Sequence, residues 1–153
     1  MGRTATILAV VALMVVSSSG VALAAYEVSI TGTDEVEIIS GTGKAEQISG
    51  LGGDDQLNGG GGVDLVDGGL GSDDLGDGPG RDTVNGNRGA DNLIGQGGDT
   101  SVDHFYAGSG RDIVQSRDVP AVKDTVGCGA GTDTVYADKA DVVGGDCERV
   151  KAW

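Results

Sequence analysis

Aliphatic residues recur along this chain with a spacing of nine residues. An aspartate stands two positions before each of them, and glycine-rich segments separate one pair from the next. The clearest stretch holds Leu57, Val66, Leu75 and Val84, preceded by Asp55, Asp64, Asp73 and Asp82. A triplet centred on one apolar side chain predicts a short strand with that side chain turned inward. Each glycine-rich segment between two triplets predicts a turn.

A nine-residue frame describes the repeat, with glycines at positions 1, 2 and 4, the acid at position 6 and the aliphatic residue at position 8. Five copies cover residues 50–94 without a gap: GLGGDDQLN, GGGGVDLVD, GGLGSDDLG, DGPGRDTVN and GNRGADNLI. Upstream, the frames 32–40 and 41–49 carry Glu37 and Glu46 at the acid position. Downstream, the rhythm resumes after two small insertions and ends at Val143. Self-similarity at a short fixed period predicts a solenoid.

The predicted fold class is all-β, a right-handed parallel β-roll (a β-helix or solenoid) of stacked nonapeptide turns. Two nonapeptides make one circuit, so the inward aliphatic side chains stack on those one circuit away and form a thin core between two parallel sheets. We expect residues 25–49 to form an N-terminal cap of degenerate repeats, 50–143 the roll and 144–153 a C-terminal cap. Together they make one domain.

The first residues read as a signal peptide over residues 1–24. A positive start at Arg3 precedes an apolar run over residues 7–16, and Ala22-Leu23-Ala24 has the small-x-small pattern of a cleavage site. The apolar run is short for a membrane span. We therefore expect an exported chain, secreted or held at the cell surface, with no membrane insertion once the leader is removed. An uncleaved N-terminal anchor is the alternative.

The net charge of the chain limits the classes of partner that it can bind. The chain has 24 acidic and 10 basic residues, a net charge of −14. Such a chain repels nucleic acid and anionic lipid and attracts cations. One phenylalanine, three tyrosines and one tryptophan cannot build a conventional globular core. Any protein or polysaccharide partner stays unidentified at this level.

The period also stacks the aspartates. Asp55, Asp73 and Asp91 fall on one edge of the coil and Asp64 and Asp82 on the other. Carboxylates one strand spacing apart, about 4.8 Å, repel each other unless a cation lies between them. Carboxylate and carbonyl oxygens in flexible turns suit Ca²⁺ better than Mg²⁺. We expect folding and calcium binding to be coupled, because one aliphatic side chain in nine residues is a thin core. Solvated carboxylates without an ion are the alternative.

Two cysteines, Cys128 and Cys147, lie near the C-terminus. In an oxidising compartment the expected state is one disulfide bond closing a short loop. Two free thiols are the alternative, and a zinc site would need more cysteine or histidine ligands than this segment has.

The segments GGGGVD, GGLGSD and DGPGRD resemble the RTX, or haemolysin-type, calcium-binding nonapeptide repeat G-G-x-G-x-D-x-U-x over about residues 32–143. The resemblance implies ions held between turns one circuit apart, by carbonyls of positions 2, 4 and 5 and the carboxylate of position 6. The implied pairs of turns are 50–55 with 68–73, 59–64 with 77–82, and 68–73 with 86–91. The implied metal-binding residues are Asp55, Gly60, Gly62, Asp64, Gly69, Gly71, Asp73, Gly78, Gly80, Asp82, Gly89, Asp91, Asp112 and Asp133.

Departures from the repeat modify this expectation. Leu51 and Asn87 replace the second glycine of their frames, and Asn tolerates left-handed geometry better than Leu. Lys44 and Glu46 argue against a full site in the frame 41–49, so residues 26–49 are expected to bind no calcium. The turns 107–112 and 128–133 have interrupted neighbours and are expected to be half-sites. The C-terminal segment resembles an ending of small exported repeat proteins of this type, in which a Cys128–Cys147 disulfide would lock the last circuit and residues 148–150 would finish the sheet.

No enzyme is expected. The lone histidine, His104, falls at an outward position, and the segment around Lys44 fails the phosphate-loop spacing. The preferred function is a secreted calcium-binding repeat protein. The alternatives are an adhesion or interaction protein that uses the calcium-loaded roll as a scaffold and, ranked last, a remnant of an RTX toxin or exoenzyme.

Overall fold

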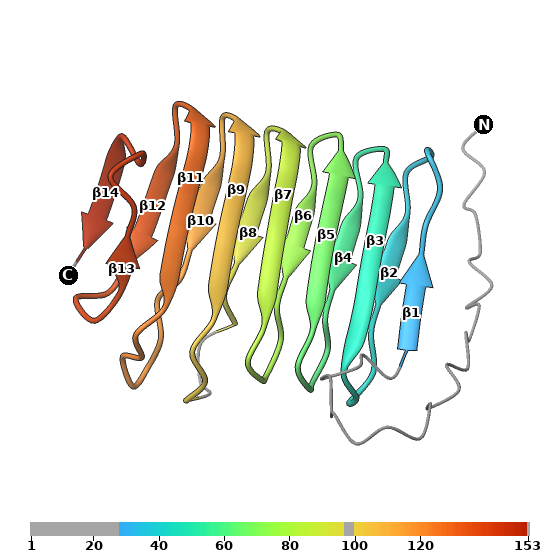
Figure 1. The fold of residues 1–153 in the computed structure, drawn as a ribbon, viewed down its shortest axis with the longest axis horizontal. Helices are drawn as coiled ribbons and strands as arrows, with labels where there is room; N and C mark the ends of the chain where they lie inside the picture. The colour runs from blue at the N-terminus through green and yellow to red at the C-terminus, as the bar shows by residue number, and fades with distance from the viewer. Residues whose placement is uncertain (1–27, 97–99, 153) are drawn as a thin grey trace, which may run out of the picture.

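The described part of the chain consists of β-strands and turns. The structure is a computed structural model, and it describes residues 28–96 and 100–152. Parallel strands coil into a solenoid of about seven circuits, with no helix in these residues (Figure 1). This confirms the predicted all-β parallel roll. The predicted signal peptide lies outside the described residues.

The strands form two parallel sheets of seven strands each. The first sheet has the order β1-β3-β5-β7-β9-β11-β13, and the second has β14-β12-β10-β8-β6-β4-β2. The strands of the first sheet are β1 Val28–Thr31, β3 Glu46–Gly52, β5 Leu65–Leu70, β7 Thr83–Gly89, β9 His104–Gly110, β11 Thr125–Gly131 and β13 Val142–Val143. Those of the second are β2 Ile38–Ser40, β4 Gln56–Asn58, β6 Asp74–Gly76, β8 Asn92–Ile94, β10 Ile113–Gln115, β12 Thr134–Ala137 and β14 Arg149–Ala152.

The nine-residue frame sets the register. Val66 lies opposite Ile48 on one side and Val84 on the other, so partners are two frames apart. Where the sequence carries extra residues the register is kept, and Val84 lies opposite Phe105. The extra residues therefore lengthen a connection without shifting the strands.

The core is a line of inward side chains between the two sheets, to which Ala107, Cys128 and Ala137 add a second inward side chain on their strands. The aliphatic residues of position 8 are at most 7 % exposed from Ile30 to Val135, and Phe105 occupies the same column. Neighbouring strand positions face outward, because side chains alternate across a strand. The core residues are Ile30, Ile39, Ile48, Leu57, Val66, Leu75, Val84, Leu93, Phe105, Ala107, Val114, Val126, Cys128, Val135 and Ala137.

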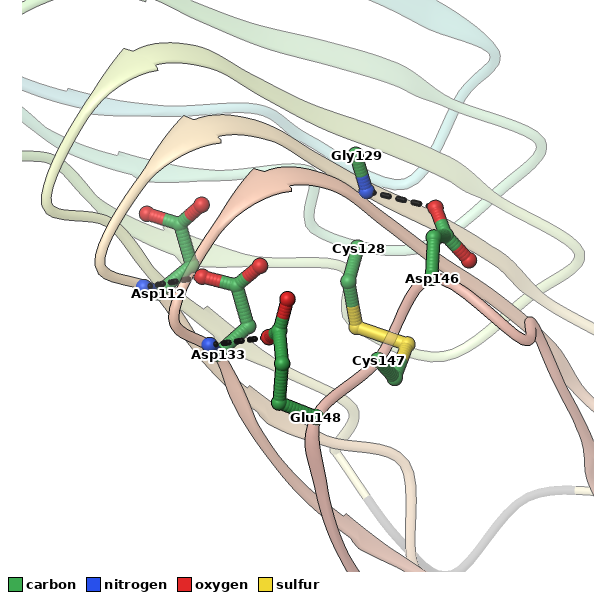
Figure 2. The surroundings of a disulfide bond; sticks show 7 residues. All are labelled: Asp112, Cys128, Gly129, Asp133, Asp146, Cys147 and Glu148. Atoms are coloured by element: carbon green, nitrogen blue, oxygen red, sulfur yellow. Dashed lines mark hydrogen bonds between the residues drawn. A yellow bond between two sulfur atoms is a disulfide. The ribbon is translucent and has the colours of Figure 1, made fainter.

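The C-terminal end is closed covalently. A disulfide bond joins Cys128, buried on β11, to Cys147, which lies between β13 and β14 (Figure 2). The chain then adds β14 to the second sheet, parallel to β12, so that Val150 lies opposite Val135. Within residues 28–96 and 100–152, no helix is long and apolar enough to cross a membrane.

Candidate metal sites at the glycine and aspartate turns

Two rows of turns follow the opposite edges of the coil (Figure 1). The first edge holds the turns that lead from the first sheet to the second, and the second edge holds those that lead back. Each edge stacks one row of acidic residues at position 6. The first-edge row is Glu37, Asp55, Asp73, Asp91, Asp112, Asp133 and Glu148, and the second-edge row is Glu46, Asp64, Asp82, Asp103, Asp124 and Asp141.

Apart from the leading Glu37 and Glu46, each carboxylate accepts a hydrogen bond through one oxygen from the turn of the preceding circuit. The N–H of Asp55 donates to Oδ1 of Asp73 at 2.8 Å, and the N–H of Asp73 donates to Oδ1 of Asp91 at 2.9 Å. On the second edge, the N–H of Asp64 donates to Oδ1 of Asp82 at 2.7 Å. These bonds fix the orientation of the carboxyl groups that follow the first residue of each row.

The other oxygen of most of these carboxylates is buried without a hydrogen-bond partner. A buried carboxylate oxygen in this state is strongly unfavourable, because its charge has lost water and gained nothing in exchange. A cation between the stacked turns would remove that penalty. The residues with such an Oδ2 are Asp55, Asp64, Asp73, Asp82, Asp91, Asp112 and Asp133.

Burial shifts the titration of these groups. It raises the pKa of Asp82 to about 8, and the carboxylate of Asp64 adds to the rise while the N–H of Asp64 opposes it. Burial likewise raises the pKa of Asp55 and of Asp91 to about 6. A proton or a metal ion can neutralise such a carboxylate, so the ion-free roll favours the protonated form.

Backbone carbonyls surround the same turns. Positions 2 and 4 of the frame adopt left-handed φ, for example 105° at Gly69 and 133° at Gly71. A Cβ placed on Gly71 would lie 1.8 Å from the carbonyl oxygen of Gly53, one circuit earlier. Successive turns therefore nest with carbonyl oxygens between them, and only glycine fits at this position.

No three carboxylate, imidazole or thiolate side chains within residues 28–96 and 100–152 converge on one point. An ion at these turns would therefore combine carboxylate with carbonyl oxygens. Such a set of hard oxygen donors matches the preference of Ca²⁺. Of the sequence-predicted residues, the first edge holds Asp55, Gly69, Gly71, Asp73, Gly89, Asp91, Asp112 and Asp133, and the second holds Gly60, Gly62, Asp64, Gly78, Gly80 and Asp82.

The comparison with protein-family models identifies the repeat. Residues 40–75 and 77–114 match the family model of the RTX calcium-binding nonapeptide repeat, in four copies. Residues 40–114 therefore carry RTX repeats. Comparison with curated proteins and with solved structures gives no significant match.

The RTX geometry continues beyond the matched residues on the first edge. The two lengthened connections, from β8 to β9 and from β10 to β11, both lead from the second sheet back to the first, so the first-edge turns stay in register. Gly108 and Gly110 take left-handed φ, as do Gly129 and Gly131. The sequence-based prediction of half-sites assumed that these turns have interrupted neighbours. Assigning alternate frames to alternate edges would have revealed that the turns 86–91, 107–112 and 128–133 stack directly.

Past Asp82, the described residues of the second edge contain no further left-handed glycines. Its acidic row continues through Asp103 and Asp124 in the lengthened connections. Burial, together with a side-chain hydrogen bond to Asp118, raises the pKa of Asp124 to about 8, although the N–H of Asp103 opposes the rise. Asp141 ends the row with Oδ2 satisfied by the Ser116 hydroxyl at 2.8 Å. Within residues 28–96 and 100–152, the complete RTX turns of this edge are therefore 59–64 and 77–82.

Leu51 takes φ 73° at a position that RTX turns usually give to glycine, and Asn87 takes φ 72°. Left-handed geometry strains Leu more than Asn. We expect Leu51→Gly to raise the free energy of unfolding by about 1 kcal/mol in saturating calcium, and Asn87→Gly to raise it less. Urea unfolding of the two variants measures this. A smaller gain for Leu51→Gly than for Asn87→Gly would show that Leu51 is not strained.

The raised pKa values predict how acid acts on the ion-free chain. A carboxyl with pKa of about 6 or 8 in the roll, and an ordinary value in the unfolded chain, makes the roll bind more protons than the unfolded chain. The stability of the ion-free roll is therefore greatest at low pH and is lost as pH rises through about 6 to 8. We expect far-UV circular dichroism in chelator to show more β-structure at pH 5 than at pH 8. Less β-structure at pH 5 than at pH 8 would contradict the raised pKa values of these carboxyl groups.

Proposed function

We propose that the chain is an exported calcium-binding protein whose roll folds as Ca²⁺ binds between stacked RTX turns. The observation that carries this proposal is the double row of buried Oδ2 atoms without hydrogen-bond partners. A cation between two turns neutralises both carboxylates and collects the carbonyls of the nested backbone. Without it, like charges one strand spacing apart favour the unfolded chain.

Five spaces between complete turns are the proposed sites. Four lie on the first edge, between the successive turns 50–55, 68–73, 86–91, 107–112 and 128–133. One lies on the second edge, between 59–64 and 77–82. In each space we assign the carboxylates of position 6 and the carbonyls of positions 2, 4 and 5. Bound ions would add to the stability of the roll, whose narrow core buries few side chains.

Three features support export. The N-terminal sequence has the pattern of a signal peptide, the cysteines form a disulfide bond, and RTX repeats are typical of exported proteins. Extracellular calcium would then fold the chain after it leaves the cell. We propose no catalytic activity, because the periodic carboxylates form a ladder along each edge instead of a pair facing a cleft.

Native mass spectrometry of the chain in calcium tests this function. We expect bound ions up to five, lost together on chelation and not replaced by magnesium at equal concentration. A chain that binds no calcium under these conditions contradicts the proposal.

A further inference from the structure

The turns at the N-terminal end of both rows differ from all the others. Turn 32–37 reads GTDEVE and turn 41–46 reads GTGKAE, so each has threonine at position 2 and glutamate at position 6. Glu37 and Glu46 are 2 % and 0 % exposed. These carboxylates are as deeply buried as the aspartates of the RTX turns, yet none of their oxygens lacks a partner.

The threonine of the same turn supplies both partners. In turn 41–46, the N–H of Thr42 donates to Oε2 of Glu46 at 3.0 Å, and the Thr42 hydroxyl donates to Oε1. In turn 32–37, the N–H of Thr33 donates to Oε2 of Glu37 at 3.1 Å, and the Thr33 hydroxyl donates to Oε1. The extra methylene of glutamate lets the carboxylate reach back to position 2 within its own turn.

The second oxygen occupies an equivalent place in both kinds of turn. A Cβ placed on the position 1 glycine would lie 2.9 Å from Oε2 of Glu46 in turn 41–46, and 2.8 Å from Oδ2 of Asp64 in turn 59–64. Oε2 of Glu46 accepts a hydrogen bond from the N–H of Thr42, whereas Oδ2 of Asp64 has no hydrogen-bond donor. Position 2 of these leading turns is also not left-handed, unlike Gly60 at φ 90°.

We infer that the threonine–glutamate pair closes a turn without an ion and thereby sets where the row of calcium sites begins. This inference rests on the proposed function and adds which residues determine where the calcium sites begin. An aspartate at position 6 with glycine at position 2 leaves an oxygen for calcium, and a glutamate with threonine satisfies that oxygen internally. The roll thus begins with a turn on each edge that needs no calcium.

Two matched amide variants separate the two kinds of turn. Glu46→Gln and Asp64→Asn remove one charge each from adjacent circuits of the same row. When a variant has lost a calcium site, its stability deficit relative to wild type grows as the calcium concentration rises. For each tenfold increase in calcium, the ratio of the two folding equilibrium constants changes by roughly a factor of ten. We expect urea unfolding at two calcium concentrations to show this growing deficit for Asp64→Asn, and a deficit independent of calcium for Glu46→Gln.

A gain of function tests the same inference in the opposite direction. The triple variant T42G/K44G/E46D converts turn 41–46 to GGGGAD, close to the GGGGVD of turn 59–64. We expect native mass spectrometry to count one more calcium ion than in wild type. K44G alone, which keeps the threonine–glutamate pair, is expected to add none.

The outcomes distinguish this inference from the proposed function. If the wild-type protein binds no calcium, the proposed function itself is contradicted. Wild type with calcium, together with a deficit that grows for Glu46→Gln, would overturn only the inference. An unchanged ion count in a triple variant that is folded by circular dichroism would also overturn it. If the triple variant does not fold, the comparison of the two amide variants decides.

Discussion

Asp73→Asn is expected to lose two calcium ions, whereas Asp133→Asn loses one. Asp73 lies between two complete turns, 50–55 and 86–91, so its carboxylate serves a space on each side. Asp133 has a complete turn on one side, and on the other its N–H donates to Glu148 at 2.8 Å beside the disulfide bond (Figure 2). Asparagine keeps the Oδ1 acceptor of the ladder, so the exchange removes charge and leaves the hydrogen bond.

The difference in stability follows from the number of sites lost. At a calcium concentration 100 times the dissociation constant, each site contributes about 2.7 kcal/mol to the free energy of unfolding. We therefore expect a loss of about 5 kcal/mol for Asp73→Asn and about 3 kcal/mol for Asp133→Asn, measured by urea unfolding in saturating calcium. Equal losses would refute the assignment of sites to the spaces between turns.

Gly71→Ala is expected to abolish calcium-dependent folding at physiological calcium. Its φ of 133° is unsuited to a side chain, and the added Cβ would lie 1.8 Å from the carbonyl oxygen of Gly53. The clash pushes apart two turns that share a proposed site. It therefore disrupts the stacking of the turns and displaces the carbonyl oxygens proposed as ligands. We expect a loss of at least about 3 kcal/mol in calcium-saturated stability.

Gly61 provides the matched control. It lies at position 3 of its turn, its φ is not left-handed, and an added Cβ would meet nothing closer than the Pro79 carbonyl at 3.6 Å. Gly61→Ala should therefore leave the calcium titration within error of wild type. A Gly71→Ala protein that folds with wild-type calcium dependence would show that the close nesting of turns is not required.

The nine-residue frame was sufficient to predict the architecture, because each short strand carries one inward side chain and the frame fixes which residue it is. Val66 and Val84 lie opposite each other as the period requires. The stacking of Asp55, Asp73 and Asp91 could also be predicted, since residues 18 apart must meet in a coil of two frames per circuit.

Other features depend on geometry that the frame does not contain. The strands of the second sheet have the expected length of three residues, or four in β12 and β14, but β3, β7, β9 and β11 of the first sheet have seven. Their glycine segments also pair with the next circuit, as Asn87 does with Gly108. This pairing follows from the stacking of whole turns, and the periodicity of side chains does not reveal it.

The closure of the leading turns was only partly foreseeable. Lys44 and Glu46 in the sequence argued against a full site in the frame 41–49. The hydrogen bonds from Thr42 that satisfy Glu46 could not be derived from spacing, because they depend on one methylene of reach within a folded turn.

The most direct test of calcium-coupled folding is a calcium titration of the chain from Ala25 onward, followed by far-UV circular dichroism. We expect a largely disordered spectrum in chelator at neutral pH and a cooperative change to β-structure at millimolar calcium, with no such change in magnesium. A spectrum that is the same with and without calcium would contradict the account.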